Sequence, residues 1–332
     1  MHALPHSTVP AAPPRRGRAV ALTDGWQRWL AQLLLAAVLW MPAMAAETAG
    51  PAPMLSIGFS SSMFSEVNEN DAKAAVKVWG QTVARTEGIQ VEPDPKIIQG
   101  MPALLQAVRN HTVDMLSLSI KEYILLRHET QFSPIFVAYI DGKISEEYVL
   151  LVHREGRIKT LADLRGRTLS LQQNVRTTLA TEWLDTLLIQ NGLRPAHEFC
   201  GSINPYPKLS KAVLPVFFRQ SDACIVTQGG YYTMCELNPQ IGRQLQVLAS
   251  SPKIVPAVLC FRADYKPEFR NRVFNALRTL HQNPAGQQVL SVFQSERLVD
   301  QPESILQESI DLFERYRRLT AAANAANTSP SP

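Results

Sequence analysis

Residues 166–178 read GRTLSLQQNVRTT, and this passage decides the fold class of the chain. Gly166-Arg167 introduces a short apolar strand at 168–171, a polar loop follows at 172–178, and an amphipathic helix begins directly after the loop. A strand that ends at the N-terminus of a helix directs free backbone N–H groups and the positive end of the helix dipole at one point. The passage therefore predicts an α/β unit whose loop suits an anionic or polar small ligand.

The same alternation of strands and helices extends along the chain on both sides of this passage. On its N-terminal side we expect strands at 54–59, 90–92 and 115–118 and helices at 71–86, 100–110 and 120–126. On its C-terminal side we expect strands at 200–203, 223–226, 245–249 and 257–261, helices at 177–190, 209–218 and 231–237, and three final helices. This order is typical of parallel sheets with helices on their faces.

Two long strand-like runs, 133–140 and 147–153, flank the turn signal Asp141-Gly142 and carry the chain out of the first α/β set. The runs at 245–249 and 257–261 bring it back. We therefore expect an α/β fold with two lobes joined by two crossings. A ligand cleft would lie between the lobes, because open α/β sheets bind ligands at the carboxyl ends of their strands.

The expected domain organisation follows from these crossings. It comprises a signal peptide (1–45), a first lobe (46–140), a crossing strand (141–153), a second lobe (154–248), a return crossing with the rest of the first lobe (249–318), and a disordered tail (319–332).

The N-terminus has the pattern of an export signal. A basic region with four arginines precedes the apolar run Leu30–Met41, and Ala43-Met44-Ala45 is a small-x-small cleavage site. The alternative is a membrane anchor, but the run is short for a bilayer span of about 20 residues. Arg15-Arg16 leaves open whether export is general or twin-arginine. The mature protein is expected to be soluble outside the cytoplasm.

Charge and cysteine content exclude several classes of protein. The chain has 33 Lys and Arg and 29 Asp and Glu; the leader contains four arginines and Asp24, so the mature chain would carry 29 basic and 28 acidic residues. This balance does not suggest a nucleic-acid partner, and no later run suggests a membrane span. Cys200, Cys224, Cys235 and Cys260 form no C-x-x-C motif, and any disulfide pairing among them stays open.

Polar residues follow the expected strand ends that would face the cleft. The candidate ligand-binding residues are Ser60, Ser61, Ser62, Ser119, Tyr123, Asn174, Arg176, Thr177, Thr178, Thr227 and Gln228. They are mostly hydroxyls and amides, which suits an anion or a polar neutral ligand held by hydrogen bonds without proton transfer. Gly229-Gly230 would let the backbone approach such a ligand closely.

Arg176 is the most specific of these candidates. A cation beside a helix N-terminus is disfavoured by the dipole unless an anion lies between them, and arginine recognises carboxylate and phosphate with a bidentate fork. The alternative is a surface arginine paired with a nearby acid such as Glu182. Thr177 and Thr178 can equally act as helix caps, and Tyr123 can equally pack in the core.

Motifs of enzymes are missing from the sequence. It contains no G-x-S-x-G, no P-loop and no G-x-G-x-x-G, and His197-Glu198 lacks the second histidine of the helical zinc-protease pattern. We therefore expect no catalytic residue, no metal site and no cofactor.

Several short motifs resemble the phosphate/phosphonate-type substrate-binding proteins of bacterial ABC transporters. DLRGRT at 163–168 with the loop to Thr178, and SDACIVT at 221–227, carry this resemblance. NHTVDM at 110–115 is similar to the family's N-G-x-V-D-hydrophobic element, and SPKIVP at 251–256 to its S-P-x-I-P crossing. The resemblance covers most of residues 54–315.

The resemblance implies a two-lobed type II periplasmic-binding-protein fold that closes around its ligand. The expected function is that of a monomeric periplasmic solute-binding protein, which captures a small phosphate-like, phosphonate-like or other oxyanion for the permease subunits of an ABC transporter. The family's N-S-T-S-G loop stands here as 174–178, NVRTT, so two hydroxyls are replaced and the ligand's identity stays open. A module that senses a ligand for a membrane receptor and an enzyme on the same fold are the alternatives.

Overall fold

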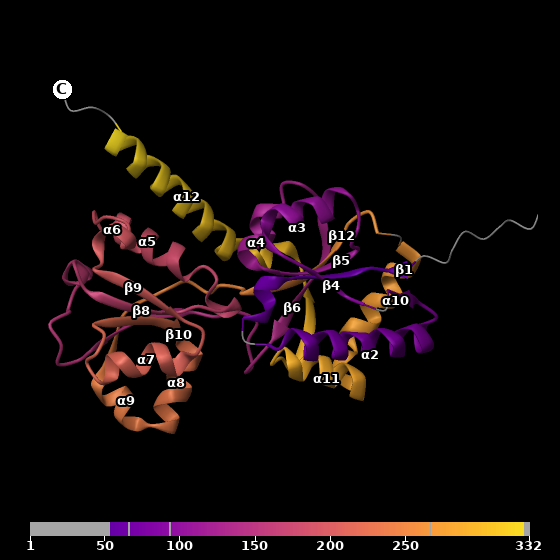
Figure 1. Ribbon diagram of the computed structural model, residues 1–332, viewed down its shortest axis with the longest axis horizontal. Coiled ribbons are helices and arrows are strands. Elements are labelled where there is room, and N and C mark those ends of the chain that lie inside the picture. Colours follow the sequence, from indigo (N-terminus) through magenta and orange to yellow (C-terminus); the bar gives the residue numbers. More distant parts are fainter. Residues whose placement is uncertain (1–53, 66, 93, 266, 329–332) are drawn as a thin grey trace, which may run out of the picture. The chain divides into compact units, whose positions relative to one another are not determined.

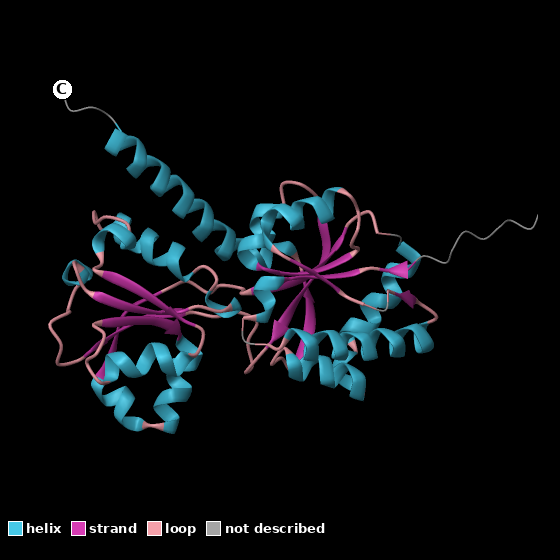
Figure 2. Ribbon diagram, in the orientation of Figure 1, coloured by secondary structure: helices cyan, strands magenta, loops and turns pink. Residues whose placement is uncertain are grey.

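The computed structural model describes residues 54–328 except 66, 93 and 266, and these belong to a single compact unit. The expected signal peptide, 1–45, lies outside the described residues. Two large sheets with helices on their faces, together with a small two-stranded sheet, make up the fold (Figures 1 and 2), so the predicted α/β class with two lobes is confirmed.

The first lobe is built on a six-stranded sheet. In spatial order its strands are β13 (Arg297–Gln301), β6 (Phe132–Tyr139), β12 (Ala257–Arg262), β5 (Met115–Ser119), β2 (Ile57–Ser60) and β4 (Lys96–Ile98). The strands β2, β4 and β5 run parallel, whereas β6, β12 and β13 pair antiparallel. A separate parallel pair joins β1 (Met54–Leu55) to β3 (Gln90–Val91).

The second lobe is built on a five-stranded sheet. Its order is β11 (Leu245–Ser250), β7 (Tyr148–His153), β10 (Ala223–Thr227), β8 (Thr168–Gln172) and β9 (Ser202–Tyr206). The strands β8, β9 and β10 are parallel, and β7 runs antiparallel to both of its neighbours.

Helices cover both faces of the first sheet (Figure 1). They are α2 (Glu69–Glu87), α10 (Pro267–Arg278) and α11 (Pro284–Val292) on one face, α3 (Gly100–Arg109) and α4 (Ile120–Leu126) on the other, with the short 3-10 turns η1 (Ser61–Phe64), η4 (Leu280–Gln282) and η5 (Glu303–Leu306). Strand alternation assigns the faces, since Met115 of β5 packs toward α2 while Leu116 and Leu118 pack toward α3 and α4. Gly88 ends α2 in the left-handed conformation, with φ 62°, as its position predicted.

The second lobe has the same layered construction. Its helices and turns are η2 (Leu161–Leu164), η3 (Val175–Thr177), α5 (Ala180–Gln190), α6 (Ala196–Phe199), α7 (Leu209–Phe217), α8 (Gln228–Leu237) and α9 (Pro239–Gln244). The helix expected from Thr177 begins three residues later, because η3 intervenes. The three-residue η3 turn separates the loop from α5, so the loop does not open directly into that helix as expected.

The chain passes between the two sheets twice, from β6 to β7 and from β11 to β12. The two passages run side by side, because Glu146 N–H donates to the carbonyl of Ile254 and Ile254 N–H donates to that of Glu146, each at 2.7 Å. The C-terminal helix α12 (Gln307–Thr328) packs against both α4 and α5. Much of the expected disordered tail, 319–332, is therefore helical as far as Thr328, consistent with the high helix propensity of its alanines.

Two further properties bear on function. Among the described residues, no helix combines the length and the apolar character that a membrane crossing needs. All four cysteines are free thiols, and burial within β10 and β12 raises the pKa of Cys224 and of Cys260.

Candidate functional site

The serines of the first lobe converge on one acid, Glu122, which sequence reasoning did not identify. Ser60 Oγ donates to Glu122 Oε1 at 2.5 Å, and Ser62 Oγ donates to Oε2 at 2.9 Å. Ser119 donates twice to Oε2, from its hydroxyl at 2.7 Å and from its backbone N–H at 2.9 Å. The hydroxyls of these three serines therefore already donate hydrogen bonds to a carboxylate of the protein. The sequence signal was available, because Ser119-x-x-Glu122 is a capping box at the start of α4.

Two other candidates of the first lobe differ in burial. Ser61 is half-buried in η1. Tyr123 is only 1 % exposed, its hydroxyl donates to Glu303 Oε1 at 3.0 Å, and its ring packs against Phe132 with the centroids 5.6 Å apart. Burial, reinforced by the Glu303 carboxylate, raises the pKa of Tyr123. Tyr123 therefore packs in the core of the first lobe.

Side chains of the loop after β8 form hydrogen bonds to the backbone of the same loop. Asn174 Oδ1 accepts from the backbone N–H groups of Arg176 at 3.0 Å and Thr177 at 3.2 Å, and Thr177 Oγ1 donates to the carbonyl of Gln172 at 2.6 Å. Asn174 is 7 % exposed, and its Nδ2 is buried without a hydrogen-bond partner. Thr178 is half-buried at the end of η3. Asn174 therefore retains an unused donor beside Arg176.

Arg176 reaches an acid on the first crossing. Its Nη1 lies 3.5 Å from Glu146 Oε1, and the side chains are 23 % and 12 % exposed. Glu182, the partner suggested by sequence, instead pairs with Lys121 at 2.5 Å. Burial raises the pKa of Glu146, whereas Arg176 and, to a smaller extent, Lys143 lower it. Glu146 was missed because only the folded chain brings the crossing to this loop.

The start of α8 lies close to the same crossing. Thr227 Oγ1 caps the helix by accepting from Gly230 N–H at 3.2 Å, and Gln228 N–H donates to the carbonyl of Glu147 at 2.7 Å. A Cβ on Gly229 would lie 3.3 Å from Lys143 Nζ, and a Cβ on Gly230 would lie 2.8 Å from Thr227 Oγ1. The two glycines therefore leave room for Lys143 and Thr227 beside the start of α8.

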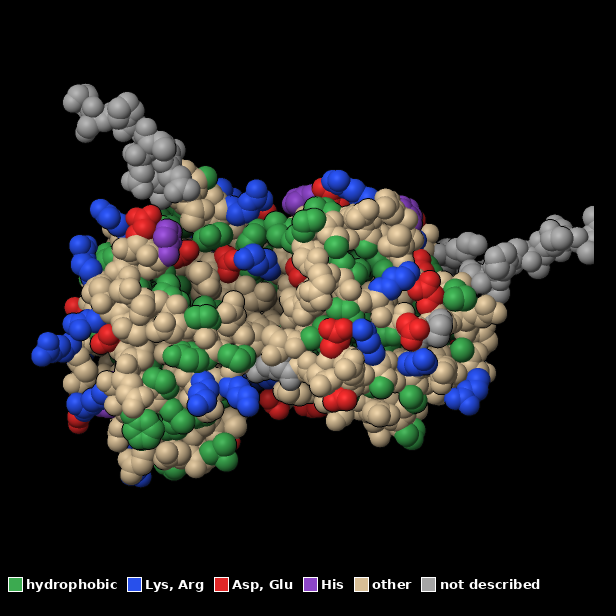
Figure 3. Space-filling model, viewed as in Figure 1, with side chains coloured by type: hydrophobic (Ala, Val, Ile, Leu, Met, Phe, Trp, Pro, Cys, Tyr) green, Lys and Arg blue, Asp and Glu red, His purple; other side chains and the backbone are tan. Residues whose placement is uncertain are grey.

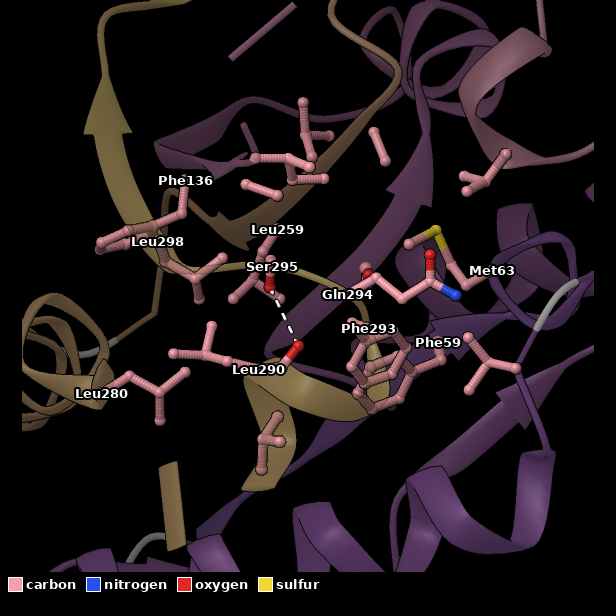
Figure 4. A pocket seen from close by; sticks show the side chains of 18 of the residues that line it. Phe59, Met63, Phe136, Leu259, Leu280, Leu290, Phe293, Gln294, Ser295 and Leu298 are labelled. Atoms are coloured by element: carbon pink, nitrogen blue, oxygen red, sulfur yellow. Dashed lines mark hydrogen bonds between the residues drawn. The ribbon is translucent and has the colours of Figure 1, made fainter. Parts of the chain in front are cut away.

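A cavity of about 150 Å³, partly open to solvent, adjoins this cluster and is lined mainly by residues of the first lobe (Figure 4). It lies between the sheet and the helices α2 and α11, and apolar side chains form most of its wall. The rings of Phe59 and Phe293 stack in that wall with centroids 5.7 Å apart. Val175 and Arg176 of the second lobe complete the lining. No pattern in the sequence indicates this cavity.

Charged side chains of both signs lie on the surface. Basic and acidic side chains are interspersed over the face shown in Figure 3. The described residues hold no cluster of three or more His, Cys, Asp or Glu side chains placed to bind a metal ion.

Comparison with known proteins gives a consistent result. The family model described as "ABC transporter, phosphonate, periplasmic substrate-binding protein" matches residues 62–304. No curated protein sequence matches the chain.

Three solved structures share the fold at low sequence identity. A Xanthomonas citri protein bound to chloride ion has a TM-score of 0.60 at 18% identity, covering 81% of this chain and 99% of its own. The binding protein component of an ABC phosphonate transporter from Pseudomonas aeruginosa has 0.55 at 17%, covering 82% and 89%. PhnD1 of Prochlorococcus marinus, in complex with methylphosphonate, has 0.53 at 16%, covering 80% and 98%.

Proposed function

Because the chain belongs to the family of phosphonate-type periplasmic substrate-binding proteins of ABC transporters, we propose that it captures a small oxyanion and delivers it to the permease of such a transporter. The ligand is phosphate, a phosphonate or a related oxyanion. The protein acts as a monomer in the periplasm after its leader is removed, and it performs no catalysis.

The free hydrogen-bonding capacity of Arg176 is the observation that carries this proposal. A guanidinium presents five N–H donors, and charge-assisted hydrogen bonds to oxygen are typically about 2.7–2.9 Å long. Within the described part of the chain, the only polar interaction of this side chain is the 3.5 Å approach to Glu146. An oxyanion would therefore find most of the donors of Arg176 unused, with Asn174 Nδ2 and Lys143 nearby.

The position of Glu122 decides which lobe can bind the charged group of the ligand. Its carboxylate holds the hydroxyls of Ser60, Ser62 and Ser119 and would repel an anion seated directly on them. The charge of the ligand is therefore met from the second lobe and the first crossing. A ligand that also touches the first lobe stabilises the closed form by its differential contacts, and the paired crossings are the natural hinge.

The test is to identify what the protein binds. Native mass spectrometry of the mature protein purified from its periplasm should reveal a small bound anion. Calorimetric titration of the ligand-free protein with inorganic phosphate, methylphosphonate and sulfate should then show saturable binding of at least one of them. Binding of none of these, together with a neutral co-purifying ligand, would overturn the proposal.

A further inference from the structure

The cavity in the first lobe is too apolar for the head of an oxyanion. Its wall comes from the sheet strands β2, β5, β6, β12 and β13 and from α2, α10 and α11. Several lining residues, among them Ala138, Pro256 and Leu298, are half-exposed, so the cavity opens to solvent and a ligand can enter it. An apolar space of about 150 Å³ is large enough for a benzene-sized group. The size and chemistry of this cavity, about 150 Å³, are those of a hydrocarbon site.

Small side chains keep the cavity open. Ala138 on β6 and Ser117 on β5 belong to its lining, while their partners across the strand pairs, Leu298 and Leu259, are large. A leucine at either small position would extend into the space. The void is therefore a property of particular residues in the sheet.

The polar part of the lining includes a charge from the other lobe. Arg176 lines the cavity together with Met63 of η1, and η1 lies against η3. Gln294 lies beside Met63, whereas Leu280 lies away from them both (Figure 4). Ser295 Oγ is directed back to the carbonyl of Leu290 at 3.4 Å. Arg176 therefore places one charged group in the otherwise mostly apolar lining of the cavity.

We propose that the ligand is an amphipathic oxyanion, whose acidic head faces Arg176 and whose hydrocarbon group, about the size of a benzene ring, fills this cavity. The inference rests on the proposed function and specifies its substrate class. Each buried methylene strengthens binding roughly fourfold, so the hydrocarbon group makes a large contribution to affinity and selectivity.

The experiment compares two probes with the same head, phenylphosphonate and methylphosphonate, by calorimetry on the ligand-free protein. The parent protein should bind phenylphosphonate at least tenfold more tightly. In Ala138→Leu and, independently, Ser117→Leu, the preference for phenylphosphonate should be lost, so that the two affinities become nearly equal. Ala162→Leu, on the exposed turn η2, is the matched control and should keep the parental ratio. Benzene should raise the melting temperature of the parent and of this control only.

The outcomes separate the two proposals. Equal affinity of the parent for both phosphonates, or a tenfold preference that survives in a folded Ala138→Leu variant, overturns the cavity assignment and leaves oxyanion capture standing. Binding of benzene without binding of either phosphonate overturns the anionic head, and with it the proposed function. If both Ala138→Leu and Ser117→Leu fail to fold, the cavity assignment is tested by the binding of the two phosphonates and of benzene to the parent protein.

Discussion

Arg176 and Glu146 face each other across 3.5 Å, so the guanidinium of the second lobe is held by an acid on the chain crossing. This separation is longer than a charge-assisted hydrogen bond, so the pair is loosely held and a ligand oxyanion can compete for the arginine.

Replacing Arg176 should weaken oxyanion binding. A hydrogen bond to a charged group is worth about 1.5–3 kcal/mol, and about 1.4 kcal/mol is one decade in affinity. Arg176→Ala should therefore bind tenfold or more weakly, and Arg176→Lys should recover only part because the fork geometry is lost. Calorimetric titration measures both. Arg219→Ala, which removes an exposed arginine paired with Glu155, is the control and should bind as the parent does. Unchanged affinity in Arg176→Ala would contradict the assignment.

Oxyanion affinity should depend on the protonation of Glu146. Burial raises the pKa of this carboxyl above its ordinary value of 4.5, with Arg176 and Lys143 opposing the shift and Asp141 adding to it. Protonation removes the charge that holds Arg176, so affinity should rise as the pH falls through the raised pKa. Methanesulfonate is a suitable probe because its own charge does not change over this pH range. Glu146→Gln should bind more tightly at neutral pH and lose this dependence; a parallel pH dependence in that variant would refute the linkage.

The same shift has a consequence for folding. A carboxyl whose folded-state pKa is raised binds more protons in the native than in the unfolded state. Its contribution to the free energy of unfolding should therefore fall as the pH rises from about 4.5 through the raised pKa. Urea unfolding of the parent and of Glu146→Gln across this range measures the effect, and the difference between them should narrow at the acid end.

Glu122 should behave as an internal anion. Glu122→Ala leaves the hydroxyls of Ser60, Ser62 and Ser119 without their acceptor, and an unsatisfied buried group costs about 1–3 kcal/mol. The melting temperature should fall, and added sulfate should raise it more in this variant than in the parent, because sulfate can replace the carboxylate. Glu236→Ala, at an exposed position, is the control. An equal response to sulfate in all three proteins would show that the serines form no anion site.

Asp114 should be essential for stability. Arg262 is 8 % exposed, and its Nη2 donates to Asp114 Oδ1 at 3.1 Å, while Asp114 Oδ2 accepts from Ser56 N–H at 2.9 Å. Asp114→Ala leaves a buried guanidinium without this partner, and removing one member of a buried pair costs about 3–5 kcal/mol. Urea unfolding should show this loss. The double variant Asp114→Ala/Arg262→Met should be less destabilised than the single one, and the opposite order would exclude a buried-charge penalty.

The sequence by itself determined the α/β class, the two lobes, the two crossings and the family. These features follow from local patterns: apolar strand runs such as β8, the glycine that ends α2, and the motifs at 110–115, 163–168 and 251–256. Local patterns also placed polar residues at the loops after β2, β5, β8 and β10. They did not reveal η3, because a single 3-10 turn before α5 has no distinct periodicity.

Only the tertiary structure decided which charges and cavities these elements bring together. Glu182 is close to Arg176 in sequence but pairs with Lys121, whereas Glu146 reaches Arg176 because the first crossing passes beside η3. Three serines from two strand ends meet Glu122, and Ala138 and Ser117 leave space beneath α2 and α11. Electrostatic partners and packing volumes depend on distances in space, and strand order and crossings set those distances independently of separation along the chain.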